Sequence, residues 1–370
     1  MKSKVLFISV ALVLAVSVGL VGCAGGGGPV GPPNDKVYIF AARPLTGSLE
    51  TIGDFAFGPV MDYWQDKVNR AGGIDVGGTI GNDIPIDLTI VDDTSDIGLM
   101  SSLLTSAINS NDYHFVLPPC STSFLQAAAG ICTGAKYVLI GAEGGCTTIK
   151  GQLQNYKYLF ATLTFSDWNQ MEKLFGILRK YQDTNGAPNP MRVFTMYVGD
   201  LHGFEYRDAF WAEAAKPANA GRFISVQNMS VPTDAVSVLP QLQAARDAGD
   251  ITLLCSFCYP PGSFLTVAEG IANNISFNAT IVGPGMNFEF MLLPPVSGVW
   301  CNLDLQGVMG FTTWNEESGG SATANFCSNF TAFFAAPGKV YNTTRDINGG
   351  GLGRFILDWW GSQPWRFGKV

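Results

Sequence analysis

Short apolar runs alternate with longer amphipathic stretches along this chain, and that alternation limits the possible folds more than any other feature. Between residues 55 and 71, for example, apolar side chains recur at helical spacing until a Gly-Gly pair ends the pattern. Strands that are each followed by a helix build parallel α/β sheets. We therefore predict one α/β unit that is complete near residue 145, with strands at 37–40, 86–91, 115–117 and 137–140 and helices at 55–71, 100–110 and 124–133.

A second unit of the same kind follows, so the predicted fold class is α/β, with two doubly wound parallel-sheet lobes in tandem. The periodicity weakens after residue 290, where one strand within 298–311 and one helix at 324–335 are expected, and the Gly- and Trp-rich end fits a truncated or irregular tail. We predict an N-terminal lobe over 36–160, a second lobe over 161–285, and a return toward the first lobe over 286–370. The second lobe has expected strands at 192–198, 222–228, 251–257 and 280–282 and helices at 167–182, 206–215, 236–248 and 264–272.

The first residues have the layout of an export signal. Lys2 and Lys4 precede an uncharged apolar run that ends at Gly22. The string LVGC at 20–23 resembles the bacterial lipobox, in which the signal is removed before a cysteine that carries acyl chains; the alternative is an ordinary signal with an incidental cysteine. We predict a signal peptide over 1–22, lipidation at Cys23, a Gly/Pro tether over 23–35, and a periplasmic or extracellular protein held at the membrane.

Composition narrows the possible partners. Hydrophobic residues make up 47% of the chain and charged residues 14%, which indicates a globular protein with a large core. The formal net charge of −8 disfavours binding to nucleic acid. Of the 8 cysteines, Cys255 and Cys258 form a CxxC pair, but residues three apart on a strand point to opposite faces, so we interpret both as buried small side chains.

Four strings of the sequence are similar, in order and spacing, to the leucine/isoleucine/valine-binding family of type I periplasmic binding proteins. The resemblance covers residues 36–290 and implies two lobes that are joined by three crossover strands and close on a small ligand by hinge motion. It also implies a non-enzymatic protein without cofactor or metal that delivers its ligand to the permease of an ABC importer. The four strings are PLTG at 44–47, VNRAGGI at 68–74, VDDTSD at 91–96 and YLFAT at 158–162.

The resemblance places one wall of the ligand site on loops of the first lobe. The loop through Cys120, Ser121 and Ser123 ends a strand and opens a helix, so its hydroxyls and free N–H groups suit an anion such as a carboxylate. Ser121 matches the family's carboxylate-binding serine; the alternative role is that of a helix N-cap. In the next loop, Thr147 stands close to the family's threonine, and Glu143 is either a solvated carboxylate or the partner of a ligand cation.

The second wall is expected on the second lobe. His202 stands where the family has a tyrosine that closes the cleft, with Phe204 close by, and Tyr259 follows another strand. At Gly285 the chain departs from the family, which has there a glutamate that pairs with the ammonium group of an amino acid. Because an unpaired buried ammonium is costly, either Glu143 or Glu289 substitutes or the ligand is not an α-amino acid.

Two other functions compete with this reading. An enzyme is disfavoured because the chain has only two histidines and no nucleophile elbow, zinc-protease motif or P-loop. A sensory ectodomain or receptor fragment of the same fold is favoured slightly by five N-x-S/T glycosylation sequons in the second half of the chain and by the extra cysteines, and disfavoured by the lipobox. The sequence therefore predicts a solute-binding protein for a small polar or carboxylate-bearing ligand, without naming the ligand.

Overall fold

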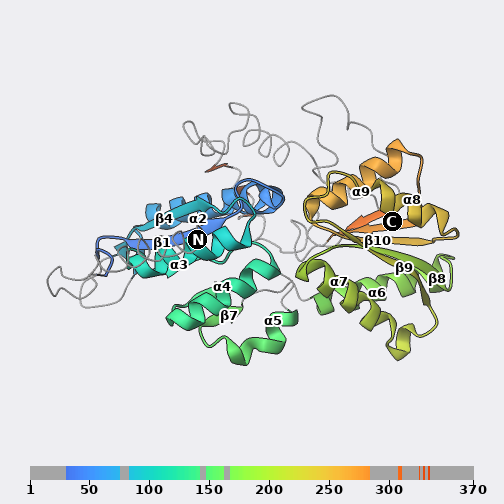
Figure 1. The fold of residues 1–370 in the computed structure, drawn as a ribbon, viewed down its shortest axis with the longest axis horizontal. Coiled ribbons are helices and arrows are strands. Elements are labelled where there is room, and N and C mark those ends of the chain that lie inside the picture. The colour runs from blue at the N-terminus through green and yellow to red at the C-terminus, as the bar shows by residue number, and fades with distance from the viewer. Residues whose placement is uncertain are drawn as a thin grey trace, which may run out of the picture.

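The computed structural model describes residues 31–75, 83–141, 147–161, 167–283 and 307–310, and five single positions between 325 and 333. These residues form two α/β lobes that lie next to each other, each on a five-stranded sheet (Figure 1). All strand pairs in both sheets are parallel, so the predicted fold class is confirmed. No helix in these ranges is long and apolar enough to cross a membrane.

The first-lobe sheet carries helices on both faces. Helices α3 (Ile97–Ser110) and α4 (Thr122–Ala135) cover one face, where Leu125 and Leu139 are fully buried, and α2 (Gly58–Arg70) packs on the other over β1 and β4. The sheet order is β4 (Ile86–Asp92), β1 (Val37–Arg43), β5 (Phe115–Val116), β6 (Leu139–Gly141) and β7 (Leu159–Ala161). A short antiparallel hairpin of β2 (Ile74–Asp75) and β3 (Asp83–Ile84) was not predicted.

The second lobe repeats this arrangement. Helices α6 (Asp167–Thr184) and α7 (Leu201–Ala214) cover one face of its sheet, and α8 (Leu239–Asp247) and α9 (Pro260–Ala272) cover the other. Cys255 packs in the core under α6 and α7, and Cys258 in the core under α8 and α9, so the CxxC pair divides between two faces as expected. The sheet order is β12 (Val308–Gly310), β11 (Ala279–Val282), β10 (Leu253–Phe257), β8 (Met191–Val198) and β9 (Phe223–Val231).

Both strand orders reverse direction at one point, and this determines where loops converge. In the first lobe, the chain leaves β1 toward α2 on one face and leaves β5 toward α4 on the other. In the second lobe, it leaves β8 toward α7 and β10 toward α9, again on opposite faces. Ligands of open α/β sheets bind in the crevice that forms at such switch points, beyond the carboxyl ends of the strands.

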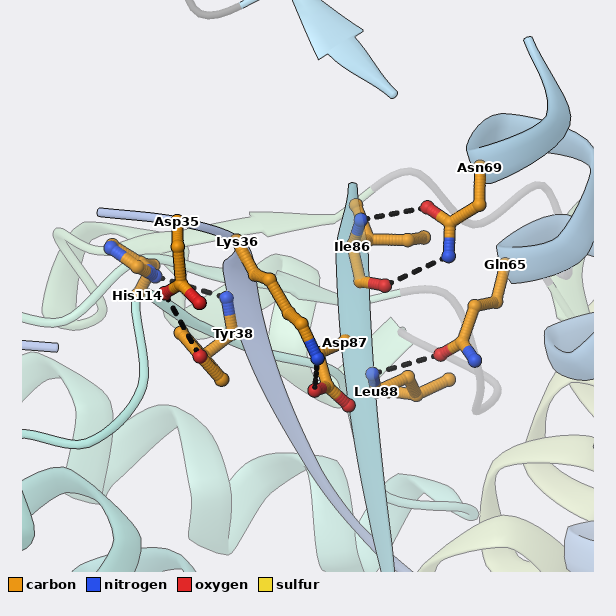
Figure 2. A network of polar contacts seen from close by, with 9 residues as sticks. All are labelled: Asp35, Lys36, Tyr38, Gln65, Asn69, Ile86, Asp87, Leu88 and His114. Carbon is orange, nitrogen blue, oxygen red and sulfur yellow. Dashed lines mark hydrogen bonds and ion pairs between the residues drawn. The ribbon is translucent and has the colours of Figure 1, made fainter. Parts of the chain in front are cut away.

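Side-chain amides protect the outer edge of the first-lobe sheet. Asn69 on α2 donates to the Ile86 carbonyl at 3.0 Å and accepts from its N–H at 2.8 Å (Figure 2). Gln65, one turn earlier, accepts from the N–H of Leu88 at 2.8 Å (Figure 2). The two amides replace the hydrogen bonds of a neighbouring strand, so this end of β4 presents fewer free backbone groups to other chains.

Three helices begin at residues other than those that the sequence predicts. The predicted helix at 55–71 is preceded by a π-helix, η1 (Thr51–Ala56), and α2 proper begins at Gly58. Helix α7 begins at Leu201 instead of 206, because the Asp200 side chain caps it by accepting from Gly203 N at 3.2 Å. Helix α9 begins at Pro260 instead of 264, because proline suits the first turn of a helix.

Candidate functional site

A chain of three hydrogen-bonded side chains, two of them buried and the third half-buried, crosses from one lobe to the other. The Ser121 hydroxyl, after β5 in the first lobe, lies 2.6 Å from the hydroxyl of Tyr259, after β10 in the second lobe. The Tyr259 hydroxyl also lies 2.6 Å from Asp200 Oδ2, after β8, and donates to it. Ser121 is therefore at the first-lobe switch point, and Tyr259 and Asp200 flank the switch point of the second lobe.

The backbone of Ser121 is strained in a way that favours a functional role. The residue has φ 83° and ψ 151°, a combination that usually requires glycine. It occupies the N-cap position of α4, yet its side chain makes no capping hydrogen bond there. The hydroxyl is directed instead to the opposite lobe, so capping does not explain this serine. Its neighbours differ from it: Cys120 is buried and Ser123 is half-buried in the first turn of α4.

His202 packs directly on this chain of hydrogen bonds. Its ring stacks on that of Tyr259, with centroids 4.7 Å apart and planes 17° apart. The residue is 8% exposed, and burial lowers the pKa of its imidazole to about 4, so it is neutral near pH 7. Its Nε2 is buried and has no hydrogen-bond partner among the described residues.

A carboxyl group that the sequence analysis missed makes a second contact between the lobes. Glu205 on α7 is 5% exposed, and its Oε1 accepts from the N–H of Thr148 on α5 (Thr147–Gln152) of the first lobe at 2.7 Å. Thr122 also hydrogen-bonds to this carboxyl. Burial raises the pKa of Glu205, and the hydrogen bonds from the two threonines partly oppose that rise. The predicted Thr147 begins α5 beside the residue that makes this contact.

The remaining predicted residues are not part of this cluster. Phe204 is 38% exposed and faces Tyr197 and the guanidinium of Arg207 instead of Tyr259. Its position follows from the early start of α7, which places it on a different side of the helix from His202 and Glu205. The positions Cys23, Glu143, Gly285 and Glu289 lie outside the described residues.

An arginine that the sequence analysis also missed supports the first-lobe loop from behind. Arg43, at the end of β1, is fully buried and donates to the carbonyl of Pro118 at 2.9 Å, three residues before Ser121. Its charge lowers the pKa of the buried Asp93, but burial has the larger effect and raises that pKa to about 6. A charged residue that ends an apolar strand run was the available sequence signal.

Comparison with known proteins agrees with this geometry. A family model described as periplasmic binding protein matches residues 41–344. The chain belongs to the periplasmic binding protein family. No curated protein matches the chain by sequence.

Solved structures place this periplasmic binding protein among relatives of the type I fold. The branched-chain amino acid transporter substrate-binding protein LivJ of Streptococcus pneumoniae, solved with isoleucine, has a TM-score of 0.63 at 17% identity, over 88% of this chain and 82% of that one. A type 1 periplasmic binding protein of Bordetella pertussis has a TM-score of 0.65 at 15% identity, over the same shares. A solute-binding protein of an R. palustris ABC transporter, solved with benzoate, has a TM-score of 0.62 at 13% identity, over 80% and 74%. At these identities the likeness establishes the fold.

The cluster in this periplasmic binding protein presents hydrogen-bonding groups. Its described groups are two hydroxyls, one neutral imidazole and two carboxyls. Ser121 pairs with a phenol and not with a histidine, so these groups do not form a nucleophile and base. His114 directly precedes β5, and its Nδ1 accepts from the Tyr38 N–H (Figure 2). What the arrangement can do is orient a small polar molecule.

Proposed function

We propose that this protein is an exported solute receptor that captures a small polar ligand, such as an amino acid or a related compound, by closing its two lobes. The observation that carries the proposal is that the switch points of both sheets meet at one largely buried polar cluster. A switch-point crevice in each lobe is where a ligand would contact both sheets at once. The family match supports binding as the activity.

The first-lobe loop supplies the side of the proposed site that binds a hydrogen-bond acceptor of the ligand. Ser121 has a hydroxyl free of any capping duty, and the N-terminal N–H groups of α4 follow it directly. A ligand carboxylate is the natural partner for such a helix start. We therefore assign a ligand carboxylate, or a similarly polar acceptor, to Ser121, with Cys120, Ser123 and Thr147 around it.

Delivery to an ABC importer is the proposed role of the captured ligand. The relatives from S. pneumoniae and R. palustris carry transporter names, which supports this role for the present chain. Lipidation of Cys23 would hold the receptor near the permease. Signalling by lobe closure is the alternative, and the neighbouring genes discriminate: adjacent permease and ATPase genes support transport, whereas a linked kinase gene supports sensing.

Thermal-shift screening of amino acids, carboxylates, amides and ureas tests the binding function. A ligand at 100 times its dissociation constant should add about 2.7 kcal/mol to the stability of the folded protein. Binding that is unchanged in Ser121→Ala would contradict the assigned site. Turnover of a bound compound would contradict the non-enzymatic role.

A further inference from the structure

The face of α7 that meets the first lobe is rich in carboxyl groups. His202 and Glu205 are three residues apart, so they are neighbours on one helix face, and Asp200 caps the same helix. Glu205 reaches across to Thr148, and Asp200 reaches toward the lobe contact through Tyr259. Two acidic side chains from one lobe thus border the predicted carboxylate-binding loop of the other.

No basic side chain balances these acids within the described ranges. Asp200 accepts hydrogen bonds from Gly203 N and the Tyr259 hydroxyl, and Glu205 accepts from two threonines. None of the described lysines or arginines forms an ion pair with either residue. Glu205 is buried and Asp200 is half-buried. A carboxylate that is withdrawn from water without a positive partner is costly, and a ligand cation would reduce that cost.

The imidazole of His202 is an independent indication that this helix face binds a polar group. Its Nε2 is buried with no described partner, although buried polar atoms almost always have one. The ring is held in place by stacking on Tyr259, within the same cluster as the two carboxyls. In the tautomer that carries its proton on Nδ1 this nitrogen is an acceptor, and an N–H donor from a ligand would satisfy it.

We propose that the α7 face formed by His202, Glu205 and Asp200 binds a protonated amine of the ligand, and so replaces the acid that the chain lacks at Gly285. This inference rests on the proposed function of the same cleft. It assigns the amine to one helix face of the second lobe and leaves the carboxylate, where the ligand has one, to the Ser121 loop. The cleft would then select ligands by their ammonium group.

Two matched ligand series test the proposal by isothermal titration calorimetry on the full chain. The first series is leucine, isocaproate and isopentylamine; the second is phenylalanine, hydrocinnamate and phenethylamine. Within each series one member has both charged groups, one lacks the amine and one lacks the carboxylate. We expect the wild-type protein to bind the members that have an amine. The Glu205→Gln variant should bind these members at least about tenfold more weakly, because the replacement leaves a buried ammonium without its charge partner.

A control variant and the remaining outcomes complete the test. Asp208→Asn removes a carboxylate from the same helix, but one that is 67% exposed and paired with Arg207, so it should leave affinity unchanged. Equal loss in both variants would indicate a general charge effect and overturn the assignment. If isocaproate or hydrocinnamate binds better than its amine-bearing partners, the amine site is wrong while the receptor function stands. If no member of either series binds, the amine site is also rejected, and the wider screen of amides and ureas decides the receptor function.

Discussion

Replacing His202 with glutamine should remove an acid-sensitive part of the protein's stability. In the folded protein the imidazole has a pKa of about 4, below its ordinary value of 6.5, because burial opposes its charge. As pH falls through 6.5 the unfolded chain therefore binds a proton that the folded chain does not bind until about pH 4. The free energy of unfolding must decrease across that window. With these two values the decrease between pH 7 and pH 5 is about 2 kcal/mol.

Urea unfolding of the wild type and of His202→Gln at several pH values measures this effect. Neighbouring groups titrate as well: the raised pKa values of Glu205 and Asp93 act in the opposite direction, because a folded protein that binds protons more readily gains stability as pH falls. These contributions are common to both proteins and cancel in the difference between their pH profiles. The charge on Asp200 also favours the imidazolium, but less than burial disfavours it. Parallel profiles for the two proteins between pH 7 and pH 5 would refute the reasoning.

Three further predictions concern packing and lobe contact. Tyr259→Phe and Ser121→Ala should each lower the ratio of closed to open ligand-free protein roughly fivefold, the equivalent of about 1 kcal/mol for one hydrogen bond. Fluorescence energy transfer between the lobes measures this ratio. If the two hydroxyls act together, their effects must be non-additive in the double variant. Asn69→Ala should lower the free energy of unfolding by about 2–4 kcal/mol and speed hydrogen exchange in β4, since it leaves a buried backbone N–H and carbonyl without partners. Unchanged exchange in β4 would show that the Asn69 side chain does not protect this strand. Gly203→Ala should destabilise the second lobe by several kcal/mol in thermal unfolding, because the new Cβ would lie 1.9 Å from a backbone oxygen of β8. Gly130→Ala is the control: its Cβ would have nothing within 4 Å, so it should stabilise α4 by about 0.5–1 kcal/mol. An unchanged stability of Gly203→Ala would contradict the close approach of α7 to β8.

The strands were the most predictable part of the fold, because a buried parallel strand is a continuous apolar run. The expected strand at 192–198 differs from β8 by one residue. The predicted start of α7 was wrong, because the residues His202 and Gly203 look like part of a loop in the sequence. Gly203 is instead required by the close approach of α7 to β8, a contact that only the folded protein reveals.

The residues that meet between the lobes were predictable on the first lobe and much less so on the second. Ser121 is recognisable from its place between a strand and a helix. Its partner Tyr259 is 138 residues away, and no local pattern specifies that pairing. Glu205 was missed for another reason: a carboxylate on an amphipathic helix is normally solvent-exposed, and only the contact with Thr148 makes it a buried residue.

The hydrogen bond from Tyr259 to Asp200 has a consequence for how quickly the receptor releases its ligand. Both residues belong to the second lobe, and His202 fixes the ring from the same side, so the phenol is oriented before the lobes meet. Closing then costs little additional side-chain entropy. Because the Tyr259 hydroxyl donates to Asp200, Ser121 must donate in the contact between the two hydroxyls, so a ligand carboxylate that takes the Ser121 proton replaces this single hydrogen bond. When such a ligand leaves, Ser121 can return to Tyr259, so this internal hydrogen bond would compete with the ligand and shorten its residence time.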